Sequence, residues 1–480
     1  MRKLFALAAC APVLFGALGI AACGGENSSR AQYHITAEYF PEERLIQAEM
    51  TALIPNDTDN ALHEMKFELY PNAYREGALY PPMPEIYAPA SYYNGDSYGN
   101  IEVLNVEGAS SFSVGGADRN VLTVTLDEPL YPDERAELGF TFEVELAEVN
   151  HRLGAGENTV ALTAFYPMLC PYGEQGFSEL VYAPYGDPFV TACADYSLTL
   201  TVPEGPRAAY GGTGTERSEN GKTIYEIKAE NAREIAVVLG EFESVKRMQG
   251  GVEIAYYYYD DGAPEYTLDI AERSLTYFSE TFGKYIYPRY TVVQTDFPYG
   301  GMEYPMLSMI SSTLRMTELP AVVAHETAHQ WWYAMVGSDQ YNSPWQDEGL
   351  AEYSTALFLG EYPEYGSSYE KAIEASEKSY RAYFSVASQL GSANALMNRP
   401  LTSYSGVYEY RCVAYDKGVI LFDRVRMVAG ERKFFSALKK YFDTYCGKTA
   451  TTADLISSFD RAGANVEGLF DSFTEGRCVI

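Results

Sequence analysis

Two short stretches decide the fold of this chain: HETAHQWW at residues 325–332 and PWQDEGLAEY at residues 344–353. In the first stretch His325 and His329 are four positions apart, so on a helix both imidazoles lie on one face and can reach one ion. Glu326, one position round the helix, then points toward the open side of that ion. The apolar spacing predicts a helix over about 317–336.

A third ligand has to come from elsewhere, because three protein ligands and a water are typical of catalytic zinc sites. The remaining histidines all precede residue 152, in a part of the chain that reads as β-structure. Glu348 follows His329 after eighteen residues, in the first turn of a second predicted helix over 347–359. We therefore predict a site for one zinc ion per chain, with His325, His329 and Glu348 as ligands and Glu326 as the general base. Glu352 could orient a ligand, but a solvated glutamate is the favoured interpretation.

The zinc stretches resemble those of the aminopeptidase N family of gluzincin zinc metallopeptidases, which includes leukotriene epoxide hydrolase. Two further segments agree with this. The run Gly300, Gly301, Met302 and Glu303 resembles the family's Gly-Ala-Met-Glu-Asn segment. The resemblance implies an edge strand that pairs with the substrate backbone, with Glu303 binding the free α-amine. Tyr415, in YDKG at residues 415–418, resembles the family's Tyr-x-Lys-Gly tyrosine, which implies a hydroxyl donor for the oxyanion.

The chain departs from the family pattern at several places. Tyr304 stands where the family has asparagine, and Tyr333 stands where a glycine usually follows the HQWW-type segment. The family's second amine anchor is a glutamine or glutamate in the β domain, and no such residue occurs at a convincing spacing around 165–170. The resemblance also implies a member without the long C-terminal helical domain of larger relatives.

The pattern of the chain changes near residue 250, which predicts a multidomain α+β protein. Before that point, short alternating apolar runs broken by Gly, Pro, Asn and Asp predict an antiparallel β domain over 33–247. After it, helical periodicity predominates, and the resemblance implies a thermolysin-like, mostly helical zinc peptidase domain with C-terminal helices over 248–480. Besides the zinc helices, we expect helices at about 267–282, 369–389, 410–428, 432–445 and 453–461.

The first residues predict export. Arg2 and Lys3 precede an apolar run that ends at Ile20-Ala21-Ala22-Cys23, which resembles the lipobox of bacterial lipoproteins. We expect residues 1–22 to be a lipoprotein signal peptide, Cys23 to be lipidated, and 23–32 to be a flexible tether. The protein would then be anchored to the outer face of a bacterial cell membrane through its lipid only. An ordinary secretory signal is the alternative.

A formal net charge of −31 argues against nucleic acid as a partner, because nucleic-acid binding depends on basic surfaces. Five cysteines remain beyond Cys23, and the sequence leaves their pairing open. It also leaves the oligomeric state open.

These observations predict a zinc metallopeptidase that acts on peptide substrates and removes N-terminal residues from extracellular peptides. One alternative is a zinc endopeptidase or short-peptide hydrolase of the same fold. A second is a non-catalytic binding or scaffold relative, which is disfavoured because every residue of the predicted zinc chemistry is present. Epoxide hydrolysis is a third, by analogy only.

Overall fold

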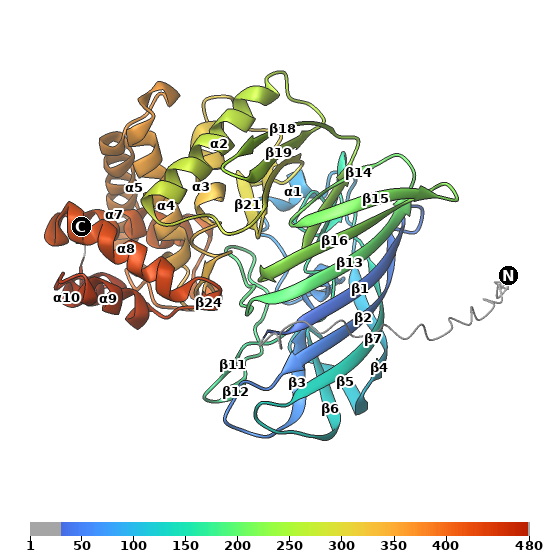
Figure 1. The fold of residues 1–480 in the computed structure, drawn as a ribbon. Coiled ribbons are helices and arrows are strands. Elements are labelled where there is room, and N and C mark those ends of the chain that lie inside the picture. The colour runs from blue at the N-terminus through green and yellow to red at the C-terminus, as the bar shows by residue number, and fades with distance from the viewer. Residues whose placement is uncertain (1–29, 479–480) are drawn as a thin grey trace.

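A β-rich N-terminal half and a helical C-terminal half lie side by side in the computed structural model, which describes residues 30–478 (Figure 1). This arrangement agrees with the predicted fold class. The predicted signal peptide, the lipidation site Cys23 and all but the end of the predicted tether lie outside the described residues. The first strand begins at Gln32.

The N-terminal half is built from three main sheets, and several strands of the largest sheet alternate buried and more exposed side chains, as the sequence predicts. The largest has seven strands in the order β15-β16-β13-β1-β2-β7-β4, and the others follow the orders β10-β3-β6-β5 and β14-β17-β9-β8. The pairing of β1 with β13 is parallel, in contrast to the antiparallel pairing expected throughout. The main strands are β1 (Gln32–Phe40), β2 (Leu45–Pro55), β3 (Leu62–Glu68), β4 (Asn100–Glu107), β5 (Ala109–Gly115), β6 (Val121–Leu130), β7 (Arg135–Glu145), β9 (Thr159–Thr163), β13 (Ala194–Pro203), β14 (Arg207–Tyr210), β15 (Thr213–Glu219), β16 (Lys222–Ala232) and β17 (Ala236–Gly240), and the two-residue strands are β8 (Gly154–Ala155) and β10 (Met168–Leu169).

The C-terminal half begins with a five-stranded sheet of order β18-β19-β20-β22-β21, beside which the helices gather (Figure 1). Strand β21 is the edge strand and carries the predicted substrate-binding residues. The strands are β18 (Glu243–Gln249), β19 (Val252–Tyr258), β20 (Arg289–Thr295), β21 (Gly301–Tyr304) and β22 (Leu307–Ser311). The helices are α2 (Pro264–Thr281), α3 (Leu319–Ala328), α4 (Trp345–Glu361), α5 (Tyr369–Gln389), α6 (Val407–Tyr410), α7 (Lys417–Ala429), α8 (Glu431–Tyr445), α9 (Thr452–Arg461) and α10 (Glu467–Thr474).

The helix predicted over 317–336 is shorter than expected, because α3 ends at Ala328. Beyond it, backbone hydrogen bonds link residues five positions apart instead of four. The amide of Ala334 donates to the carbonyl of His329, and the amide of Met335 donates to the carbonyl of Gln330. The two tryptophans at 331–332 are buried in the core beside α2 rather than continuing the helical stripe. Apolar periodicity alone does not reveal this turn, since the buried residues after Ala328 are as apolar as a helix face.

The helix predicted over 410–428 is present but contains a wider turn. A π-helical segment, Arg411–Asp416, separates α6 from α7. Such segments often occur at functional sites, and this one contains Tyr415. The helices predicted at 369–389 and 432–445 are α5 and α8, whose bounds agree with the prediction to within a residue.

Both tyrosines that depart from the family pattern bond to the N-terminal half. The hydroxyl of Tyr304 donates to Oγ1 of Thr163 at 3.0 Å. The hydroxyl of Tyr333 donates to the buried carboxylate of Glu234, while its carbonyl accepts from Nε of Arg233 at 2.5 Å. These bonds attach the substrate strand and the turn after α3 to the β half.

The five cysteines within the described residues are unpaired. In the same part of the chain, no helix combines the length and the apolar character needed to cross a bilayer.

We predict that Tyr333→Phe lowers the free energy of unfolding by about 1 to 3 kcal/mol at pH 8, because Glu234 would stay buried without the one donor it has among the described residues. Burial raises the pKa of Glu234 to about 7, so at pH 8 it is largely ionised. Urea denaturation of both proteins measures the difference. Tyr131→Phe is the matched control, since the Tyr131 ring is 56% exposed. Equal stabilities of Tyr333→Phe and wild type would contradict the role assigned to this bond.

Candidate metal centre

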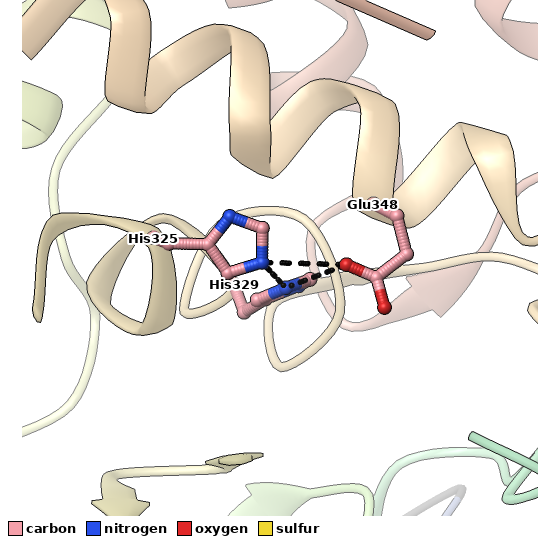
Figure 2. Close-up of side chains that lie close together, drawn as sticks. All are labelled: His325, His329 and Glu348. Atoms are coloured by element: carbon pink, nitrogen blue, oxygen red, sulfur yellow. Dashed lines mark hydrogen bonds and ion pairs between the residues drawn. The ribbon is translucent and has the colours of Figure 1, made fainter. Parts of the chain in front are cut away.

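Helices α3 and α4 bring His325, His329 and Glu348 together (Figure 2). The Nε2 atoms of the two histidines lie 3.1 Å apart. Oε2 of Glu348 lies 3.3 Å from Nε2 of His325 and 3.4 Å from Nε2 of His329. The three atoms thus form a nearly equilateral triangle, contributed by the last turn of α3, the residue that caps its C-terminus and the first turn of α4.

The triangle fits a tetrahedral zinc ion. Ligand atoms at about 2.0 to 2.2 Å from zinc in a tetrahedron are roughly 3.3 to 3.6 Å from one another, close to the separations observed. Oε2 of Glu348 is buried and has no hydrogen-bond donor within the described residues. A buried carboxylate oxygen without a partner is unfavourable, and a cation at the centre of the triangle would satisfy it.

The histidine ligands are oriented by two acids on α4. Nδ1 of His329 lies 2.8 Å from Oδ1 of Asp347, and Nδ1 of His325 lies 2.8 Å from Oε2 of Glu352. The second pair has the distance of an ion pair but is poorly aligned for a hydrogen bond. A carboxylate behind a ligand histidine fixes the ring and raises its basicity. The favoured interpretation of Glu352 as a solvated glutamate is therefore wrong, because the helical turn places it behind His325.

Glu326 occupies the position expected of a general base. Its side chain lies against Gly301 of β21, where an added Cβ would come within 2.5 Å of Oε1 of Glu326. Gly301 is therefore required for the Glu326 carboxylate to lie between strand β21 and helix α3. Burial raises the pKa of Glu326 to about 7, although the neighbouring histidines oppose this. A pKa in this range suits a group that accepts and returns a proton near neutral pH.

Tyr415 lies across the metal triangle from α3. Its ring stacks on that of His325 with centroids 5.7 Å apart, and its hydroxyl donates to Oε1 of Glu348. Tyr410 also reaches this oxygen, at 3.4 Å. Burial, together with the charge of Glu348, raises the pKa of Tyr415 well above its usual value, so the phenol keeps its proton.

The other predicted residues form the opposite wall of the cleft. Met302 and Glu303 are buried on β21, while Gly300 and Gly301 line the cavity. Oε1 of Glu303 is buried without a hydrogen-bond partner in the described chain. Burial and then the charge of Asp187 raise the pKa of Glu303 well above its usual value.

Sequence reasoning missed Asp187 and Arg152, which come from the β half. Nη1 of Arg152 donates to Oδ1 of Asp187 at 2.7 Å, and both residues line the cleft with Glu303. Asp187 lies in a Gly-Asp-Pro turn, which in sequence is indistinguishable from any other turn. The cleft has a volume of about 570 Å³, within the range of small-molecule sites.

Comparison with known proteins identifies the helical half. Residues 266–473 match the pattern of the peptidase family M1 domain. These residues form an M1 peptidase domain. The match contains His325, Glu326, His329, Glu348, Glu303 and Tyr415.

Relatives of known name extend the comparison. The chain is 27% identical over 192 residues to leukotriene A-4 hydrolase of Xenopus laevis, covering 38% of this chain and 30% of that protein. It is 23% identical over 426 residues to aminopeptidase N of Lactococcus lactis, covering 78% of this chain and 48% of that protein. The chain thus spans about half of these relatives' length or less.

An M1 zinc metallopeptidase from Deinococcus radiodurans has the same fold over 94% of this chain and 93% of its own, with a TM-score of 0.64 and 18% identity. The similarity includes the β half, which lies outside the matched M1 pattern.

Proposed function

We propose that this protein is a zinc-dependent aminopeptidase, which hydrolyses the first peptide bond of peptide substrates. The observation that carries the proposal is the triangle of His325, His329 and Glu348 with Glu326 beside it in the same cleft. The aminopeptidases among the relatives support the peptide-bond chemistry. A variant of the Deinococcus protein is described as bound to a Tyr-Ser-Ala substrate, which supports the substrate class.

Zinc held by the three ligands would lower the pKa of a water and polarise the scissile carbonyl. Glu326 accepts the proton of the attacking water, as its pKa of about 7 permits. The protonated carboxyl then returns that proton to the leaving amine. Because Glu326 is not one of the three ligands, its role is separable from metal binding.

Tyr415 supplies the hydrogen bond for the oxyanion that develops on the carbonyl. Its hydroxyl lies at the metal triangle, remains protonated, and bonds to Glu348 in the absence of substrate. In catalysis the same donor would turn to the carbonyl oxygen, where it acts mainly in the transition state.

The N-terminal ammonium of the substrate fits between Glu303 and Asp187. Both side chains are buried and line the cleft, and a carboxylate oxygen of Glu303 lies within 4.8 Å of a ring nitrogen of His329. Asp187 is held in place by Arg152, whereas Oε1 of Glu303 has no hydrogen-bond partner among residues 30–478. Asp187 therefore takes the place of the second amine anchor, which the sequence did not reveal.

A peptidase without exopeptidase preference remains the second candidate. It is favoured by the open β21 edge, where a strand of substrate can pair with the backbone at Gly300 and Gly301 irrespective of its terminus.

To test the zinc mechanism, Glu326→Gln should retain one zinc per chain while kcat falls by at least about 10³-fold, since the general base is removed but the ligands are kept. Metal analysis and peptide turnover on the same samples measure both quantities. Glu374→Gln, an exposed change on α5, is the matched control. Full activity of Glu326→Gln, or a wild type that binds no zinc, would exclude this mechanism.

To test the amine site, we expect Glu303→Gln to reduce kcat/KM on free-amine peptides by roughly ten- to a hundredfold, because a charge-assisted contact in a buried site is lost. N-acetylated versions of the same peptides should be affected far less. The measurement is the ratio of kcat/KM for free and acetylated peptides. An unaltered ratio would leave the zinc chemistry in place and favour the second candidate.

We further propose that the protein is exported and anchored by a lipid on Cys23. The support is the sequence of residues 1–23 alone, with its basic start, apolar run and small residues before the cysteine. Mass spectrometry of the mature protein should find a diacylated or triacylated N-terminal Cys23, and Cys23→Ser should abolish this. An unmodified N-terminus downstream of residue 23 would exclude the anchor.

A further inference from the structure

Arg411 is an exposed guanidinium on the wall of the cleft. It is the first residue of the π-helical segment, one turn before Tyr415, and both residues line the cavity. The turn that positions the oxyanion donor therefore also positions this charge.

The Arg411 side chain has no close polar partner in the described part of the chain. Among residues 30–478 it forms no hydrogen bond, ion pair or contact over an aromatic ring, whereas Arg152, the other guanidinium of the cleft, is bonded to Asp187. The charge of Arg411 acts on Asp416 and Glu352, but neither acid forms an ion pair with it. Asp416 accepts from Oγ of Ser379 at 2.6 Å, and Glu352 contacts His325.

The position of Arg411 gives the cleft two electrostatically different ends. Glu303 lies on the His329 side, where a carboxylate oxygen of Glu303 and a ring nitrogen of His329 are within 4.8 Å of each other. On the His325 side, Oε2 of Glu352 lies 2.8 Å from Nδ1 of His325, and the charge of Arg411 acts on Glu352. The metal triangle lies between the two ends.

We propose that Arg411 binds the C-terminal carboxylate of the substrate, so that the enzyme prefers peptides of two or three residues. This inference rests on the proposed aminopeptidase function and specifies its substrate class. A substrate with its ammonium at Glu303 and its first peptide bond over the metal triangle continues toward Arg411. One extended residue spans about 3.3 to 3.6 Å. Because the cleft has a volume of only about 570 Å³, a short peptide is needed to place the terminal carboxylate inside it. A guanidinium pairs with a carboxylate in a bidentate manner, which no other unpaired group of this wall can provide.

The experiment compares peptides that differ only at the C-terminus. The probes are Ala-Ala and Ala-Ala-Ala, each as the free acid and as the C-terminal amide. For wild type we expect kcat/KM to be about tenfold higher for each acid than for its amide, mainly through KM. In Arg411→Met the ratio should fall to about one, and Arg411→Lys should retain part of it. Arg381→Met, which removes an exposed arginine from α5, is the matched control and should keep the wild-type ratio.

Several outcomes would overturn the proposal. An acid-to-amide ratio near one in wild type, or a ratio that Arg411→Met leaves unchanged, removes the carboxylate role while the aminopeptidase function stands. If Ala-Asp-amide is preferred over Ala-Ala-amide and the preference is lost in Arg411→Met, the group bound is a side-chain carboxylate instead. By contrast, a zinc-loaded wild type that cleaves none of these peptides, nor longer ones, contradicts the proposed function itself.

Discussion

The burial of several carboxylates around two imidazoles is the constraint on which the rest of this structure depends. Glu303 and Glu326 lie buried in the cleft with the ligand Glu348, Asp347 lies buried behind His329, and burial raises the pKa of Glu303, Glu326 and Asp347. Ionised acids at this density are unfavourable unless positive charge compensates them. Histidines oriented for a cation provide part of that compensation, and the ammonium group of a substrate would provide more. The same charges that disfavour an empty cleft therefore favour metal and substrate.

Holding such a cluster together requires backbones to approach closely. Helix α4, which carries Glu348, crosses α7 at Gly349 and Gly418, where an added Cβ at Gly418 would lie 2.6 Å from Cα of Gly349. The glycine of the YDKG motif thus sets the distance between the ligand and Tyr415. This packing explains in physical terms why the motif combines a tyrosine with a glycine three residues later, since any side chain at the crossing would move the donor away from the metal triangle.

These contacts also show how far the sequence could be read. The metal triangle was predictable because its geometry is local: two histidines one turn apart, then a glutamate in the first turn of the next helix. The roles of Tyr415 and Glu303 came from resemblance, since both lie far along the chain from the ligands. Asp187 and Arg411 were not predicted. Packing between the two halves brings Asp187 to the cleft, and the π-helical turn places Arg411 on its wall. Neither arrangement produces a periodic pattern in the sequence.

The two tyrosines that depart from the family pattern, Tyr304 and Tyr333, both connect the two halves of the protein. The amine site has one acid on β21 and one in the β half, so its geometry depends on how firmly the two halves are joined. Tyr304 follows Glu303 directly and bonds to Thr163, which lies on β9 of the β half. Tyr333 follows the second ligand by one turn and bonds to Glu234 in the same half. An asparagine is too short to span as far as Tyr304, and a glycine has no side chain to donate. Tyr304 and Tyr333 therefore join the substrate strand and the metal-binding helix to the half that supplies Asp187. In this way they fix the separation of Glu303 and Asp187.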